Sequence, residues 1–205
     1  MRRVLVLALL ALVLPAATWA SGIDLVNKGG TVSISAAGIV SKGMQLSQYN
    51  GIQAPQGHSL GTVAYSTGAC LTGCAQLLTG GNATFSSVGS SFVVVGKGNF
   101  GQPKGVIFSG AFTGDISWTL VSHSGQTYTF QLSGNIAGTD FNGRMVHGTT
   151  TQTIVTAGAQ LGRGIGHSTV GGTHLVVPEP GTLGLLGTGL VGIAGMVRRK
   201  LVARP

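Results

Sequence analysis

Apolar and polar residues alternate with a period of two in several short stretches of this chain. The apolar positions are Val32/Ile34, Met44/Leu46, Val63/Tyr65, Phe92/Val94, Ile116/Trp118/Leu120 and Tyr128/Phe130/Leu132. Because successive side chains of a strand point to opposite faces of a sheet, each stretch would bury one face. Glycine interrupts almost every window of helical length, and no extended pattern with a period of 3.6 residues occurs. The middle of the chain is therefore predicted to be all-β.

Turn-forming residues lie between these stretches and suggest how the strands are connected. Asn142-Gly143 is the strongest hairpin signal, since both residues tolerate the positive φ of a type I′ turn. Gly114-Asp115 fits a two-residue turn between Phe108–Phe112 and Ile116–Val121, and Ser124-Gly125 precedes the next alternating stretch. Strands about ten residues apart with such turns predict an antiparallel meander that closes as a sandwich or a barrel. A Gly-rich parallel β-helix is the alternative fold, although the regular repeat that it requires is not found.

Aromatic residues are unevenly distributed along the β-rich domain, which we assign to residues 21–156. All seven Phe and Trp118 lie between Phe85 and Phe141, so the predicted core occupies about residues 82–156. The part before it is richer in Gln, Gly and Ala and is expected to supply edge strands and loops. The Gly-rich residues 157–176 are either a spacer that lifts the domain off a membrane or one more irregular hairpin.

The N-terminal segment, residues 1–20, has the order of a secretory signal peptide. Arg2-Arg3 precedes the unbroken apolar run Val4–Leu14, and cleavage is expected between Ala20 and Ser21. As a helix this run spans only about 16 Å, well short of a bilayer core of about 30 Å. A removed signal helix is therefore favoured over a retained anchor.

Residues 177–205 carry a different signal, which begins with the motif Val177, Pro178, Glu179 and Pro180. The Gly-rich apolar run 182–197 follows and would be about 24 Å long as a helix, so it is predicted to be a single transmembrane helix. A basic stop comes next, made of Arg198, Arg199 and Lys200, and the positive-inside rule leaves it in the cytoplasm with the rest of the chain outside. The two prolines hold Glu179 in an extended peptide of the kind that a protease binds.

The order of motif, apolar segment and basic cluster resembles a PEP-CTERM sorting signal, found at the C-terminus of exported proteins of Gram-negative bacteria. The resemblance covers Val177 to Arg204. It implies that an exosortase-like membrane protease cleaves near the Pro-Glu-Pro motif, after signal peptidase and the export machinery have acted. It also implies cells that produce exopolysaccharide and form biofilms or flocs. The segment from Phe108 to Leu120, with Tyr128 to Ile136, resembles a β-rich domain of uncharacterised PEP-CTERM proteins.

The net charge of +8 would suggest nucleic acid as a partner, but half of the twelve basic residues belong to the two terminal signals. Between Ser21 and Val177 the charged residues are scattered and give a net charge of +3. They are Lys28, Lys42, Lys97, Lys104, Arg144 and Arg163 against Asp24, Asp115 and Asp140. We therefore expect no nucleic-acid partner, whereas weak attraction to an acidic polysaccharide stays open.

Cys70 and Cys74 are the only cysteines. In an oxidising exported setting such a pair predicts a structural disulfide, which would add about 2 kcal/mol of stability because the closed loop is short. Free thiols are the alternative. A redox-active pair normally has two intervening residues, and here there are three.

The chain offers little that could catalyse a reaction or hold a metal ion. A glycoside hydrolase needs two carboxylates about 5 to 9.5 Å apart, but the exported middle contains no Glu, and Asp115 and Asp140 both adjoin predicted turns. The five histidines are dispersed at 58, 123, 147, 167 and 174 without the spacing of a metal site. No Gly-x-Ser-x-Gly stands between a strand and a helix. We therefore expect no catalytic residues, no metal ligands, no cofactor and no enzymatic activity.

These features together predict an exported protein, held transiently in the inner membrane and then released to the cell surface or extracellular matrix. Its expected role is structural or adhesive, in association with exopolysaccharide. Two alternatives stay open: a secreted module that binds or degrades polysaccharide, and a periplasmic protein anchored permanently by its C-terminal helix.

Overall fold

The alternating stretches become strands in the computed structural model, which describes residues 22–177. Each alternation noted in the sequence lies in a strand and turns its apolar side chains inward, as predicted. The strands of this part are β1 (Gly22–Lys28), β2 (Thr31–Ser35), β3 (Gly38–Lys42), β4 (Met44–Tyr49), β5 (Ile52–Gln53), β6 (Gly61–Ser66), β7 (Cys70–Thr72), β8 (Ala83–Phe85), β9 (Ser91–Lys97), β10 (Lys104–Phe112), β11 (Ile116–Ser124), β12 (Thr127–Asp140), β13 (Met145–Ala157) and β14 (Ile165–Val176). Its two short helical segments are the 3₁₀ helix η2 (Cys74–Thr79) and α2 (Gly158–Leu161).

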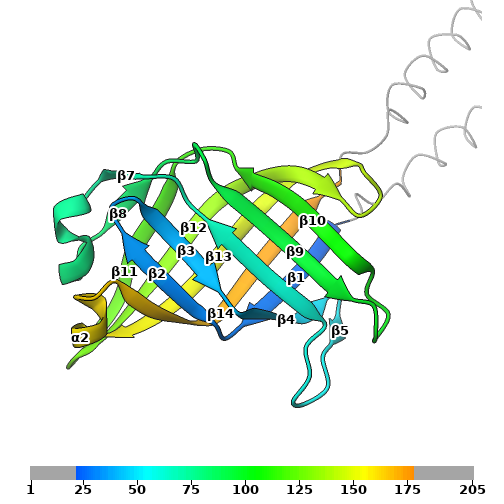
Figure 1. Ribbon diagram of the computed structural model, residues 1–205, viewed down its shortest axis with the longest axis horizontal. Helices are drawn as coiled ribbons and strands as arrows, with labels where there is room; N and C mark the ends of the chain where they lie inside the picture. Colours follow the sequence, from blue (N-terminus) through cyan, green and yellow to red (C-terminus); the bar gives the residue numbers. More distant parts are fainter. Residues whose placement is uncertain (1–21, 178–205) are drawn as a thin grey trace, which may run out of the picture. The chain divides into compact units, whose positions relative to one another are not determined.

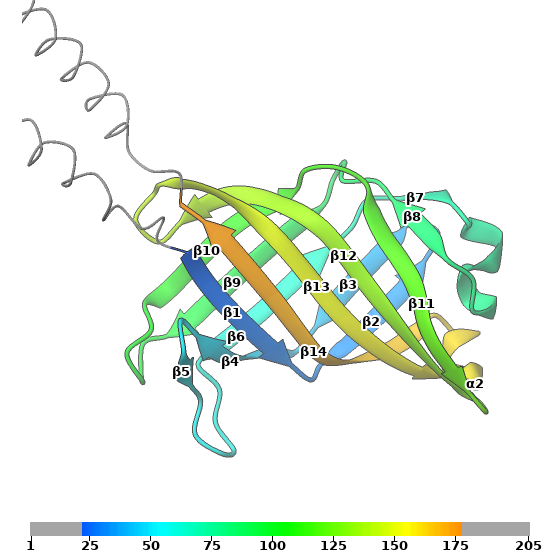
Figure 2. The same ribbon diagram turned by 180° about the vertical axis from the view of Figure 1, so that it is seen from behind.

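Eight of these strands close into an antiparallel barrel (Figures 1 and 2). Around the ring the order is β1, β14, β13, β12, β10, β9, β6 and β4, which pairs again with β1. The other strands widen the wall: β2 and β3 bridge β14 and β6, and β11, β8 and β7 continue from β12. The barrel form of the predicted antiparallel fold is therefore confirmed, and the parallel β-helix is wrong.

The predicted turn at Gly114-Asp115 is wrong, because β10 and β11 do not pair with each other. Both strands pair with β12: Phe112 lies opposite Ile136, and Ser117 lies opposite Ser133. They therefore run end to end along one edge of this 14-residue strand. A Gly-Asp dipeptide permits a turn but does not demand one; here the chain only bends at Gly114, and the long partner strand pairs with the strand on either side of the bend.

Two Asn-Gly dipeptides form hairpins with different turns. Asn142-Gly143 does connect β12 to β13, but only Gly143 has a positive φ, of 74°, so the predicted type I′ geometry is wrong. The Gly143 N–H donates to the Asp140 carbonyl, as in a type I turn followed by a left-handed glycine. The paired positive φ angles occur instead at Asn50 (45°) and Gly51 (82°), in the two-residue turn from β4 to β5.

Residues 157–176 are not a spacer, which corrects one of the two interpretations of this Gly-rich segment. They contain α2 and β14, and β14 is hydrogen-bonded to β1 on one side and β13 on the other. The predicted limits of the core were also too narrow, since β1, β4 and β6 are walls of the barrel. The buried set begins at Ile23 and ends at Val177. Few aromatics lie in this early part, so aromatic content alone underestimated the core.

One side of the barrel interior is filled by aromatic rings, and we call it the aromatic side. It consists of Tyr65, Phe92, Phe108, Phe112, Trp118 and Phe130, which come from β6 and from β9 to β12. Trp118 stacks on Phe130 with 4.5 Å between ring centroids. The Phe92 ring lies parallel to that of Tyr65 and edge to face with those of Phe108 and Phe112, each with 6.1 Å between centroids. Such arrangements are favourable beyond the apolar area that they bury.

The opposite side of the interior, which we call the amide side, carries a buried polar cluster among aliphatic residues such as Leu25, Ile154 and Leu175. Asn27 of β1 and Gln152 of β13 exchange two hydrogen bonds, of 2.8 and 3.2 Å, between their side-chain amides. Both residues lie opposite Gly171 of β14, which stands between them. A Cβ on Gly171 would come within 1.9 Å of Gln152 Oε1, so the missing side chain is what lets the amides meet. Gln152 also donates to Thr150, whose hydroxyl bonds that of Thr173.

Candidate functional site

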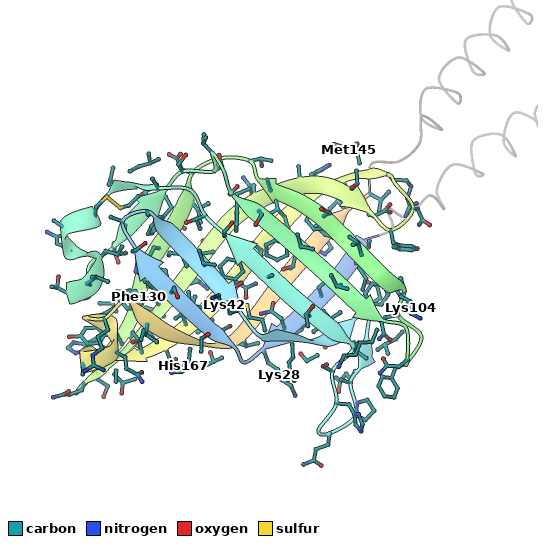
Figure 3. The ribbon with its side chains drawn as sticks, viewed as in Figure 1. Lys28, Lys42, Lys104, Phe130, Met145 and His167 are labelled. Atoms are coloured by element: carbon teal, nitrogen blue, oxygen red, sulfur yellow. A yellow bond between two sulfur atoms is a disulfide. The ribbon has the colours of Figure 1, made fainter. Side chains whose placement is uncertain are left out.

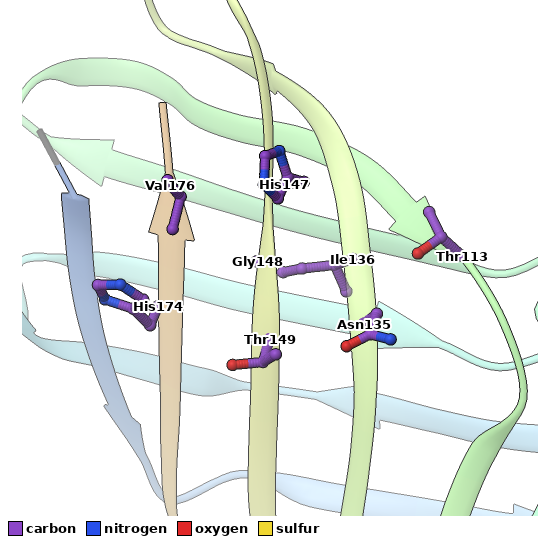
Figure 4. A pocket seen from close by; sticks show the side chains of 8 residues that line it. All are labelled: Thr113, Asn135, Ile136, His147, Gly148, Thr149, His174 and Val176. Atoms are coloured by element: carbon purple, nitrogen blue, oxygen red, sulfur yellow. The ribbon is translucent and has the colours of Figure 1, made fainter. Parts of the chain in front are cut away.

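A shallow groove of about 390 Å³ lies on the outer face of β12, β13 and β14. Figure 4 shows its lining residues, which are Thr113, Asn135, Ile136, His147, Gly148, Thr149, His174 and Val176. The side chains of Asn135, His147, Thr149 and His174 are exposed, because each occupies an outward position of its strand. The volume of the groove falls within the range of small-molecule sites, about 300 to 1,000 Å³.

Strand register assembles the polar side of this groove. Thr149 lies opposite both Asn135 and His174, and His147 lies opposite Val176. His174 Nδ1 is hydrogen-bonded to the Asp24 carboxylate of β1 at 2.5 Å, and both side chains are more than half exposed. In the sequence these two histidines are 27 residues apart and show no metal-site spacing. No signal in the sequence could have joined His147 to His174, since only the pairing of β13 with β14 brings them to one surface.

This groove can donate and accept hydrogen bonds, but it holds few charged groups. Most of its accessible lining is apolar, and the imidazoles, hydroxyls and amide lie among these apolar groups. Within residues 22–177 no three side chains of His, Cys, Asp or Glu lie close enough together to hold a metal ion. The Asp24 carboxylate is hydrogen-bonded to His174, and Asp24 is not among the residues that line the groove.

Asp140 stabilises the turn between β12 and β13. Its Oδ1 accepts backbone N–H groups of Asn142 and Arg144, and its Oδ2 accepts Nε and Nη2 of Arg144 at 2.9 and 2.7 Å. Burial would raise the pKa of this carboxyl, but the hydrogen bonds from Arg144 and Asn142 and the Arg144 charge outweigh it, so the pKa is lowered. All its partners are supplied by the turn, which gives Asp140 a structural role.

Trp118 belongs to the core and lines no polar pocket. Its side chain is fully buried, between β8 and β12. The aromatic stack continues outward from Phe130 to Tyr128 and then to His123, whose ring lies 4.1 Å from that of Tyr128. His123 is exposed at the far end of this stack. A polysaccharide site built on Trp118 is therefore not what the structure contains.

Cys70 and Cys74 are joined by a disulfide, with their Cα atoms 5.8 Å apart. This bond connects the start of β7 to the start of η2. Leu77 of η2 is buried against the core, so the short crosslinked loop holds this helix over the barrel.

The predicted N-terminal signal and the C-terminal sorting motif adjoin paired strands of the barrel. Gly22, the first residue of β1, lies opposite Val176, the last residue of β14. Val177 is buried and ends the described part of the chain. The remaining predicted sorting and cleavage residues lie outside the described residues: Ala20, Ser21, Pro178, Glu179, Pro180, Arg198, Arg199 and Lys200. The predicted transmembrane segment 182–197 also lies outside, and among residues 22–177 no helix is both long and apolar enough to cross a membrane.

Comparison with protein families identifies one match, a PEP-CTERM protein-sorting motif at residues 176–200. No curated protein and no solved structure matches the chain. The chain thus carries the sorting motif expected from its sequence. This motif marks an exported protein that is sorted at the membrane to the cell surface and implies processing by exosortase, a membrane protease.

Proposed function

We propose that the barrel of residues 22–177 is a non-catalytic structural or adhesive module of the extracellular polysaccharide layer. The terminal signals deliver it: signal peptidase removes residues 1–20, the segment 182–197 holds the precursor in the inner membrane, and cleavage near Pro178–Pro180 releases it. The mature protein then acts through its outer surface, which is rich in Ser, Thr and Gly and poor in charge.

The observation that carries this proposal is the filled interior of the barrel. Rings occupy the aromatic side, and the polar groups of the amide side hydrogen-bond one another. Enzymes and ligand carriers built on barrels commonly use the interior or its mouth. Here the largest interior side chains pack together with no exposed area, which leaves the outer wall as the working surface.

Cell fractionation of three strains tests the proposal: one with the full chain, one with a chain that ends at Val177, and one without the protein. We expect the full chain in the extracellular polymer, the truncated chain in the periplasm, and polymer retention by cells only with the full chain. The truncated chain keeps every described residue, so its circular dichroism should match that of the released protein. Equal polymer retention in all three strains would contradict the structural role.

The groove on β12, β13 and β14 supports a second candidate function, specific binding of a polysaccharide. Imidazole, amide and hydroxyl groups converge there from three strands. Co-sedimentation with the extracellular polymer distinguishes the two candidates. His147→Ala would weaken sedimentation if the groove binds the polymer, whereas His167→Ala, an exposed position of β14 outside the groove, would not. Equal sedimentation of both variants and the wild type favours the structural role without a specific site.

Permanent anchorage in the inner membrane is a third candidate, and it makes a different prediction for the end of the mature chain. A permanently anchored protein would keep residues 182–205 and stay with the membrane fraction. A processed one would lose them.

A further inference from the structure

One end of the barrel carries both ends of the described chain, and register identifies the loops around it. Gly22 lies opposite Val176, and His147 also lies opposite Val176, so the turn from β12 to β13 belongs to this end. Phe108 of β10 lies opposite Asp140, and Lys104 lies opposite Lys97, so the loop from β9 to β10 belongs to it too. In Figure 3 the labelled Met145 lies near the point where the described chain ends.

The exposed phenylalanines of the chain gather at this end. Of the seven Phe, five are buried in the core. The other two are Phe100, in the loop from β9 to β10, and Phe141, in the turn from β12 to β13, with 37% and 45% of their surfaces exposed. Met145, just after the same turn, is 65% exposed. Each of these loops has a basic residue in or beside it: Lys104 in one case and, in the other, Arg144, whose guanidinium is paired with Asp140.

Chain length keeps this end close to the membrane in the precursor. Only four residues, 178 to 181, separate Val177 from the apolar run that begins at Thr182. Fully extended, four residues span at most about 14 Å. A surface tethered so closely has a high effective concentration at the headgroups, so a weak contact suffices to hold it there. Apolar side chains flanked by Lys or Arg suit the boundary between headgroups and acyl chains.

We infer that this surface, made of Phe100, Lys104, Phe141, Arg144 and Met145, docks on the phospholipid headgroups while the sorting segment is still attached. Docking would hold the barrel against the membrane with the Pro178–Pro180 motif at the headgroup boundary, where a membrane protease acts. The opposite end of the barrel, with η2, α2 and the hairpin from β11 to β12, then faces away from the membrane. This inference rests on the anchoring step of the proposed function.

Fluorescence quenching in the full chain tests the inference, with two reporters at opposite ends of one strand. Phe141 follows β12 and Gln126 precedes it, and both are exposed. The 14-residue strand separates them by about 45 Å. Phe141→Trp and Gln126→Trp are each made in a Trp19→Phe background, so the buried Trp118 is the shared reference. The proteins are reconstituted in phosphatidylethanolamine and phosphatidylglycerol vesicles that carry a nitroxide on the lipid headgroup.

We expect the Phe141→Trp variant to lose most of its added fluorescence and the Gln126→Trp variant to keep it. Equal quenching of both variants, or of neither, would overturn the inference. An alkaline carbonate wash separates this failure from failure of the proposed function. If the wash removes the chain from the vesicles, the anchoring step is wrong; if the chain stays but Phe141→Trp is unquenched, only the docking is wrong.

A longer tether distinguishes docking from mere proximity. A Gly/Ser linker of about 20 residues, inserted between Val177 and Pro178, has a root-mean-square end-to-end distance of about 25 Å. Docking predicts that the Phe141→Trp variant stays quenched with this linker, and that Phe100→Ser with Met145→Ser then abolishes the quenching. Loss of quenching when only the linker is inserted would mean that the short tether alone kept Phe141→Trp near the headgroups, and this result would overturn the inference.

Discussion

The two sides of the barrel interior are held together by different physical means. On the aromatic side, rings from β6 and β9 to β12 exclude water and pack by shape. On the amide side, β1, β14 and β13 are joined by side-chain hydrogen bonds that pass over Gly171. A slip of β14 by one residue in one direction would turn Val170 inward between the two amides, whereas a slip in the other direction would place Gly172 there. We therefore expect the aromatic side to contribute more to stability, and the amide pair to favour this register of β14 over the one that places Val170 between the amides.

Removing the largest ring from the aromatic side should have the largest effect. We expect Trp118→Ala to lower the free energy of unfolding by about 3 to 5 kcal/mol, because it deletes a fully buried indole and leaves a cavity. A loss of that size is a large part of the free energy of unfolding of a typical domain, which is about 5 to 15 kcal/mol. Urea denaturation measures the loss. Phe141→Ala, at an exposed position, is the control and should change stability by about 0.5 kcal/mol or less.

Filling the gap at Gly171 should break the amide side. A Cβ there would stand 1.9 Å from Gln152 Oε1, so the amide pair must separate inside the barrel. We expect Gly171→Ala to cost about 1 to 3 kcal/mol, the penalty for buried polar groups left without partners. The neighbouring Gly172 has nothing within 4 Å of an added Cβ, which makes Gly172→Ala a matched control. Equal stability of the two variants in urea would refute the role given to the amide pair.

The charged turn at the barrel end should add a contribution to stability that is lost in acid. The pKa of Asp140 is lowered in the folded state, so its stabilisation is present above the unfolded pKa and is lost as the pH falls through the folded pKa. We expect Asp140→Asn to cost about 1 to 2 kcal/mol at neutral pH. The difference from wild type should shrink as the pH falls below about 4. A difference that stays constant from neutral pH to about pH 2 would contradict the assignment.

The smallest effect is expected at the exposed pair of Asp24 and His174. Both side chains are more than half exposed, so solvent screens their interaction. We expect Asp24→Asn to change the free energy of unfolding by about 0.5 kcal/mol or less. A loss as large as that of Gly171→Ala would mean that the outer wall contributes to stability as much as the amide side.

The two sides also differ in how far the sequence predicts them. Alternation at Phe92/Val94 and Ile116/Trp118 placed the aromatic side, because a period of two determines which side chains share a face. Nothing comparable marks Asn27, Gln152 and Gly171, which meet only through the register of three strands. Gly171 was therefore assigned only to a Gly-rich segment that was either a spacer or an irregular hairpin. The sorting motif was predictable for another reason, because its residues are contiguous in the sequence. His147 and His174 lie on different strands, and only the pairing of β13 with β14 brings them to one surface.

Intact-mass analysis of the protein recovered from outside the cells is the sharpest test of whether both terminal segments are removed. We expect a chain that begins at Ser21, ends between Val177 and Thr182, and is oxidised at Cys70 and Cys74. Recovery of a chain that still ends at Pro205 would contradict it, since the barrel would then remain attached to the segment that is proposed to be removed.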